Sequence, residues 1–114
     1  MSSAPLPAGH SAVRRGGDRW QDMLPHAAKA ARLLRAIGNE QRLVVLCHLT
    51  AGELSVSELN RRIPLSQSAL SQHLAVLRAA GVVSTRRASQ MVYYKLRAGP
   101  AARVVAALHR SFCR

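Results

Sequence analysis

Apolar residues between positions 66 and 81 recur at the three- and four-residue spacing of a helix that covers a core. Leu70, Leu74 and Leu77 fall on one side of this helix. The opposite side holds short hydroxyls, carboxamides and alanine, and carries no charge before Arg78. Because a helix that faces only water usually carries Glu and Lys, this bare polar face predicts contact with another molecule.

Three further helices precede this one, and each has a start or stop signal. Asn39 can cap the second helix, Ser55 and Glu58 fit a capping box at the start of the third, and Ser66 can cap the fourth. Gly38 is placed to end the first helix. The four expected helices span residues 20–37, 40–51, 56–63 and 66–81.

The pattern then changes to β-branched and aromatic runs at residues 82–88 and 91–96, which predict a hairpin turning at Ser89 and Gln90. A last helix is expected over residues 101–113, with an apolar stripe broader than one small neighbour requires. The predicted order is four helices, two strands and a helix. This is a mainly α fold with a β-hairpin wing, of the α+β class: a winged helix-turn-helix.

The chain of 114 residues predicts one domain, at residues 21–114, behind a flexible tail at residues 1–20 that is rich in Pro, Gly and Ser. The tail lacks the apolar stretch of a secretory signal, and the apolar runs fall short of the roughly 18 residues that a membrane span needs. We therefore expect a cytoplasmic protein with no membrane partner.

The formal net charge of +12 is unevenly distributed. All five acidic residues lie at or before Glu58, whereas ten Lys or Arg and no acid follow it. Such a basic half suits a polyanion such as DNA. It also lacks the carboxylates on which general acid-base chemistry and catalytic triads depend, so we expect no enzyme, no catalytic residue and no cofactor.

A short helix, a tight turn and a helix with an uncharged polar face together indicate a helix-turn-helix whose second helix enters the major groove of double-stranded DNA. Carboxamides and hydroxyls on that helix would pair with base edges, and arginines around it and on the wing tip would contact the backbone. His73 falls on the buried side, where a hydrogen bond to backbone or phosphate is favoured over a base contact. The expected DNA-binding residues are Ser66, Gln67, Ser68, Ser71, Gln72, His73, Arg61, Arg62, Arg78, Arg86, Arg87 and Gln90.

Two cysteines, Cys47 and Cys113, are expected in the second and last helices. Neither lies in a C-x-x-C or other metal-spaced cluster. A permanent disulfide is not expected in a reducing compartment, so the pair either fills core or forms a reversible, regulatory link.

The run LSQSALSQHLAVLRAAGVV, with NEQRL before it and TRRASQMVYY after it, resembles the ArsR/SmtB family of dimeric winged-helix repressors over roughly residues 24–113. The resemblance implies a homodimer formed through the first and last helices. Its two recognition helices would lie about one DNA turn apart on a palindromic operator.

Many members of that family sense metals, but this chain departs from them. It has ELSVSEL where thiolates are typical of the third helix, so Ser55 and Ser57 replace the soft ligands, and no metal is expected there. On the last helix His109 has no acidic partner.

The cysteines in RLVVLC and LHRSFC instead resemble the dithiol branch of the family, which responds to reactive sulfur species or oxidants. The resemblance implies that reduced protein binds DNA and that a disulfide or polysulfide between Cys47 and Cys113 switches it. Two alternatives stay open: a metal-responsive repressor using His48, His109 and the thiols, and a DNA-binding architectural module that senses nothing.

Overall fold

The computed structural model describes residues 19–113, which belong to two compact units, residues 1–31 and 32–114. Most of the tail expected at residues 1–20 lies outside the described residues. Trp20 belongs to a 3-10 turn.

The helix expected over residues 20–37 was predicted wrongly at its start. Within residues 19–37 the structure has two 3-10 turns, η2 (Trp20–Asp22) and η3 (Leu24–His26), and the α-helix α1 spans only Ala27–Ile37. Pro25 lies in the first turn of η3. Because proline has no N–H to donate and restricts the residue before it, a continuous helix from residue 20 is disfavoured.

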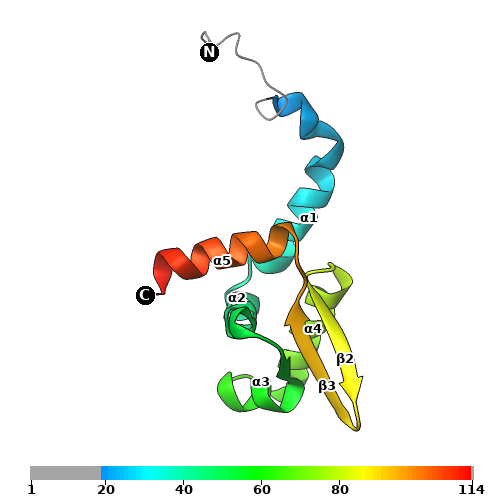
Figure 1. The fold of residues 1–114 in the computed structure, drawn as a ribbon, viewed down its shortest axis with the longest axis vertical. Helices are drawn as coiled ribbons and strands as arrows, with labels where there is room; N and C mark the ends of the chain where they lie inside the picture. Colours follow the sequence, from blue (N-terminus) through cyan, green and yellow to red (C-terminus); the bar gives the residue numbers. More distant parts are fainter. Residues whose placement is uncertain (1–18, 114) are drawn as a thin grey trace. The chain divides into compact units, whose positions relative to one another are not determined.

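The second unit follows the predicted order (Figure 1). Helix α2 is followed by a 3-10 turn, η4, and a short strand, β1; the helix-turn-helix, the hairpin and the last helix come next. The bounds are α2 (Glu40–His48), η4 (Leu49–Ala51), β1 (Leu54–Ser55), α3 (Val56–Arg62), α4 (Gln67–Ala79), β2 (Val83–Ala88), β3 (Met91–Leu96) and α5 (Pro100–Phe112).

The three expected N-terminal caps are confirmed, and they fix where the helices begin. The Asn39 side chain accepts a hydrogen bond from the backbone of Arg42 at 3.0 Å. In the capping box, the Glu58 N–H donates to Ser55 Oγ at 3.1 Å, and the Ser55 N–H donates to Glu58 Oε1 at 2.9 Å. Ser66 Oγ accepts from the backbone of Ala69 at 3.1 Å. Each cap satisfies an N–H group that the helix leaves unpaired.

Helix α4 passes directly into the wing through a turn that requires glycine. Gly81 has φ +74°, and its N–H donates to the Arg78 carbonyl while that of Val82 donates to the Leu77 carbonyl, each at 3.0 Å. These two bonds are those of a Schellman motif, which ends a helix and reverses the chain. Strand β2 begins at the next residue, so the position of the wing is set by the end of α4.

The sheet has three antiparallel strands in the order β1-β3-β2, and the sequence predicted only the last two. Leu54 and Ser55 of β1 pair with Tyr94 and Tyr93 of β3. A strand of two residues is too short to show the alternation that predicts a strand.

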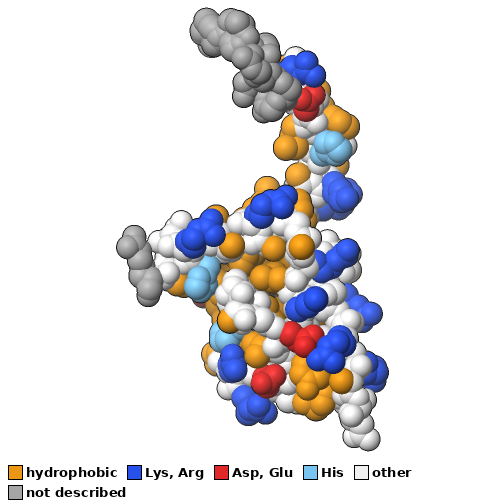
Figure 2. All heavy atoms as spheres, viewed as in Figure 1, with side chains coloured by type: hydrophobic (Ala, Val, Ile, Leu, Met, Phe, Trp, Pro, Cys, Tyr) orange, Lys and Arg blue, Asp and Glu red, His pale blue; other side chains and the backbone are white. Residues whose placement is uncertain are grey.

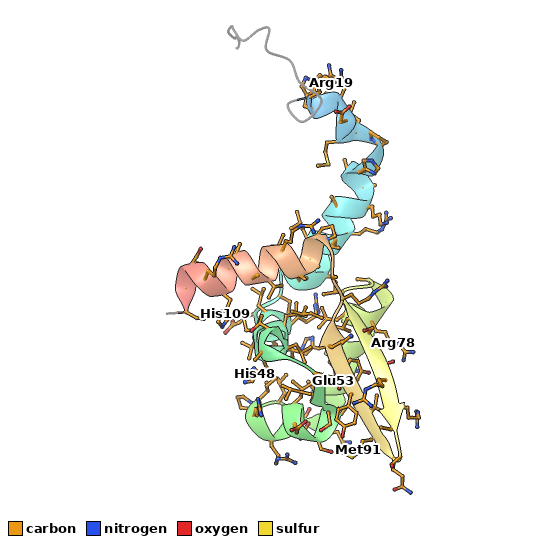
Figure 3. All side chains as sticks on the ribbon, in the orientation of Figure 1. Arg19, His48, Glu53, Arg78, Met91 and His109 are labelled. Carbon is orange, nitrogen blue, oxygen red and sulfur yellow. The ribbon has the colours of Figure 1, made fainter. Side chains whose placement is uncertain are left out.

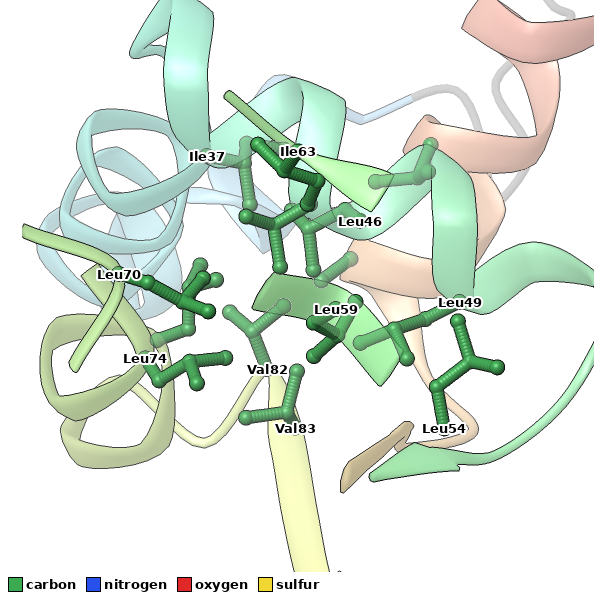
Figure 4. Packing of buried hydrophobic residues seen from close by; sticks show 14 residues of the cluster. Ile37, Leu46, Leu49, Leu54, Leu59, Ile63, Leu70, Leu74, Val82 and Val83 are labelled. Carbon is green, nitrogen blue, oxygen red and sulfur yellow. The ribbon is translucent and has the colours of Figure 1, made fainter. Parts of the chain in front are cut away.

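The core lies between α2, α3, α4 and the base of the sheet (Figure 4). The three leucines on the apolar side of α4 are buried, as predicted. They pack with Leu46 of α2, Leu59 of α3 and Val83 of β2. None of the helices described between residues 19 and 113 is long and apolar enough to cross a membrane.

Candidate DNA interface and cysteine pair

Helix α4 presents the polar face that the sequence predicted. The side chains of Gln67, Ser68, Ser71 and Gln72 are exposed, opposite the buried leucines. Ala75 lies on the same exposed side. The face therefore offers carboxamides, hydroxyls and a methyl group, which match the donors, acceptors and thymine methyls of a major groove.

Basic side chains surround this helix. Arg61 and Arg62 end α3, Arg78 lies in the last turn of α4, and all three are exposed. On the face that Figure 2 shows, residues 32–113 carry many basic side chains and few acidic ones. This charge pattern favours binding to a phosphate backbone.

The wing arginines differ from the expected arrangement at a tip. Ser89, with φ +57°, and Gln90 form the turn, whereas Arg86 lies in the body of β2 opposite Tyr93. Its guanidinium contacts the Glu53 carboxylate and the Tyr93 ring. Arg87 is exposed and pairs in register with Val92.

His73 forms a bridge between helices that sequence reasoning missed. Its Nε2 lies 2.8 Å from Gln41 Oε1 and donates to it, while Nδ1 accepts from Arg42 Nη1 at 3.4 Å. Arg42 also donates through Nε to the Ala36 carbonyl at 2.5 Å. His73 therefore ties α4 to the start of α2 through the side chains of Gln41 and Arg42. Its partner lies 32 positions away, and no local pattern encodes such a contact.

The cysteines lie on α2 and directly after α5, two helices that pack against each other. Both thiols are free; Cys47 is half-buried and Cys113 is exposed. Burial raises the pKa of the Cys47 thiol, and the neighbouring Cys113 raises that pKa further. Two thiols that the sequence separates by 66 positions therefore lie on, or directly after, helices that pack against each other.

The same region offers no donor set for a metal. Among residues 19–113, no group of three or more His, Cys, Asp and Glu side chains is arranged to hold an ion. His48 lies on α2 and His109 on α5 (Figure 3). Nδ1 of His48 is within hydrogen-bond distance, 2.9 Å, of the Val44 carbonyl.

The fold and the polar face of α4 define a winged helix-turn-helix protein that binds DNA. The sequence model described as "Bacterial regulatory protein, arsR family" matches residues 39–85. The chain is 50% identical over 93 residues to the transcriptional activator HlyU of Vibrio cholerae, covering 82% of this chain and 86% of HlyU. It is 42% identical over 93 residues to a biofilm growth-associated repressor of Xylella fastidiosa, covering 82% of each chain.

The structure of reduced HlyU from Vibrio cholerae superimposes with a TM-score of 0.77, covering 82% of this chain and 99% of that one at 50% identity. The chain therefore belongs to the ArsR family of DNA-binding transcriptional regulators and is not an enzyme.

Proposed function

We propose that this chain is a homodimeric regulator, most simply a repressor, that binds a palindromic operator when reduced and loses affinity when Cys47 and Cys113 are linked. The observation that carries the proposal is the placement of two free thiols, one on α2 and one directly after α5, on helices that pack against each other. The contribution of Cys113 to the raised pKa of Cys47 supports it. A bond between them would join α2 directly to the end of α5.

We assign the DNA contacts to exposed polar and basic side chains of α3, α4 and the wing. Carboxamides and hydroxyls of α4 read base edges, arginines beside them bind phosphates, and the wing tip contributes Gln90. Ser66 caps α4 and His73 hydrogen-bonds to α2, so both hold α4 in position rather than contact DNA directly. The proposed direct contacts are Gln67, Ser68, Ser71, Gln72, Gln90, Arg61, Arg62, Arg78 and Arg87.

A second copy of the chain is the proposed partner of the exposed apolar side chains on α1 and α5. Leu34, Leu108 and Phe112 expose 53%, 36% and 81% of their surface, unusual for side chains of this size. Burying each would contribute about 1.5–3 kcal/mol. A two-fold dimer formed there presents two copies of α4 to the two half-sites of one operator.

The chemistry of the switch balances with either class of oxidant. A peroxide takes two electrons and two protons from the thiols and leaves as water or an alcohol. An organic persulfide transfers its outer sulfur to one cysteine and leaves as a thiol. The second cysteine then attacks the inner sulfur of the new persulfide, forming the disulfide and releasing hydrogen sulfide.

The hydrogen bonds of α2 support a route from the thiols to the DNA. Cys47 lies near the end of α2, whereas Gln41 and Arg42 at its start bond to His73 of α4. A shift of α2 caused by the Cys47–Cys113 link therefore acts on the recognition helix through His73.

A reporter fused to the upstream region of the chain's own gene tests this function in cells. Wild-type protein is expected to change reporter expression on exposure to an organic persulfide or peroxide, whereas Cys47→Ser and Cys113→Ser hold it constant. The direction of the wild-type change shows whether the chain represses. A full response from both serine variants would contradict the thiol switch without affecting the DNA-binding assignment.

A further inference from the structure

A bidentate ion pair joins the wing to the segment before β1. Arg86 Nη2 donates to Glu53 Oε1 at 2.7 Å, and Arg86 Nε donates to Oε2 at 3.0 Å. The guanidinium carbon also lies 4.6 Å from the centre of the Tyr93 ring. Arg86 is therefore held on one side by two parallel charge-assisted hydrogen bonds and on another by a cation-π contact.

Strand register places Arg86 and Arg87 on opposite faces of the wing, because successive side chains of a strand alternate. Arg86 pairs with Tyr93 across the hairpin, on the same face as Glu53. Arg87 shares its face with Val83, which is buried in the core beneath α4. The face that continues from the recognition helix thus carries Arg87.

Glu53 is the acid that the fold supplies to this basic region. No Asp or Glu follows Glu58, and the Glu58 carboxylate accepts a hydrogen bond within the capping box. The hydrogen bond from Arg86 is the main cause that lowers the pKa of Glu53, with Arg86 and Lys95 charges adding to it. Glu53 also stands two residues after η4, which continues α2, so the pair connects the wing to the helix that carries Cys47.

We propose that Glu53 is a positioning residue for DNA binding: it clamps Arg86 against Tyr93 and thereby fixes the orientation of the wing. Arg86 is then a structural cation that contacts no phosphate, and Arg87 is the backbone contact of β2. Figure 3 shows Glu53 beside the hairpin that it holds.

The salt dependence of DNA binding separates a clamp from a phosphate contact. A plot of log K against log salt concentration has a negative slope, and its steepness decreases by about 0.9 for each phosphate contact that a substitution removes. The decrease is about 1.8 when two copies bind one site. A residue that only orients the wing changes affinity with little change in this slope. Lysine can replace arginine at a phosphate but cannot form the two parallel bonds to Glu53.

The experiment compares wild-type protein with Glu53→Gln, Arg86→Gln, Arg86→Lys and the control Arg87→Gln on the duplex upstream of the chain's gene. Anisotropy titrations at four salt concentrations give the slopes, and hydrogen exchange reports the mobility of β2 and β3. All substituted side chains are exposed, and thermal unfolding confirms that each variant is folded.

We expect Arg87→Gln to reduce the steepness of this slope by about 1.8 and to leave hydrogen exchange in the wing unchanged. The three clamp variants should keep the wild-type slope, exchange faster in β2 and β3, and bind the operator more weakly by a similar factor of about two to five, the range of an exposed ion pair. The double variant Glu53→Gln with Arg86→Gln should be no weaker than either single one.

A slope for Arg86→Gln that falls as far as that for Arg87→Gln, with Arg86→Lys restoring it, would overturn the proposal, since Arg86 would then contact phosphate. Wild-type affinity and wild-type exchange in all three clamp variants would overturn it as well. An unchanged slope in Arg87→Gln would overturn the assignment of the backbone contact to Arg87.

Discussion

The proposed DNA-reading region, formed by α3, α4 and the wing, and the cysteine region, formed by α2 and α5, are built differently. In the first, α3 and α4 are capped and buried on one side, and the turn at Gly81 fixes the wing. A single chain therefore completes the reading surface. In the second, one free thiol lies on α2 and the other directly after α5, whose Leu108 and Phe112 side chains remain exposed. Caps, core packing and the Gly81 turn hold the reading surface in place, whereas the cysteine region can still form a covalent link and an interface.

The largest expected effect comes from forming a covalent link within the cysteine region, which sharpens this contrast. A disulfide between Cys47 and Cys113 closes a loop of 66 residues and should raise the free energy of unfolding by about 4 kcal/mol in the chain-entropy model. Urea denaturation of reduced and oxidised protein measures this difference, with Cys113→Ser as the control that should not respond. An oxidised protein that melts at the reduced midpoint would indicate no intrachain bond.

Shortening a buried leucine should damage the reading region more than shortening an exposed side chain damages the cysteine region. Leu74→Ala in α4 removes a fully buried side chain and should cost about 2–5 kcal/mol of unfolding free energy. Phe112→Ala should cost the single chain little, but it should weaken the dimer. Chemical denaturation and sedimentation velocity separate these two effects; equal losses of folding stability would break the comparison.

Loss of the capping box should be a smaller effect confined to the start of α3. Ser55→Ala removes the hydroxyl that accepts the Glu58 N–H, and it should lower the unfolding free energy by about 1 kcal/mol. The matched change Ser57→Ala, at an exposed position in the first turn, should lie within about 0.5 kcal/mol of wild type. Thermal denaturation of both variants checks this difference.

The smallest effect concerns the pH dependence of Cys47. Its pKa is raised, first by burial and then by Cys113, so its reactive thiolate should form at higher pH than that of an ordinary cysteine. Cys113→Ser removes the second cause and should shift the midpoint of the alkylation rate of Cys47 to lower pH. Rates of iodoacetamide labelling from neutral to alkaline pH test the sign; a shift to higher pH would contradict the proximity of the two thiols.

Local signals explain what the sequence predicted well. The caps at Asn39, Ser55 and Ser66 depend on residues at most three positions apart, and the leucine stripe of α4 depends on its own periodicity. The starts of α2, α3 and α4 and the polar face of α4 followed from these signals.

Contacts between distant residues account for what the sequence did not predict. Strand β1 exists because β3 pairs with it, and the bonds of Arg86 to Glu53 and of His73 to Gln41 each span more than 30 positions. Composition suggested that Arg86 was available to DNA because no acidic residue follows Glu58. The fold instead places Glu53, which precedes it in the sequence, within hydrogen-bond distance of Arg86. The closeness of Cys47 and Cys113 was implied by family resemblance alone.

The most direct test of the account is the affinity of the protein for the duplex upstream of its gene, measured by fluorescence anisotropy at one salt concentration. Reduced protein should bind that duplex well above a random one. Treatment with an organic persulfide should lower the affinity at least tenfold, about 1.4 kcal/mol, with recovery on reduction. Equal binding by reduced and treated protein would contradict the switch and return Cys47 and Cys113 to structural roles.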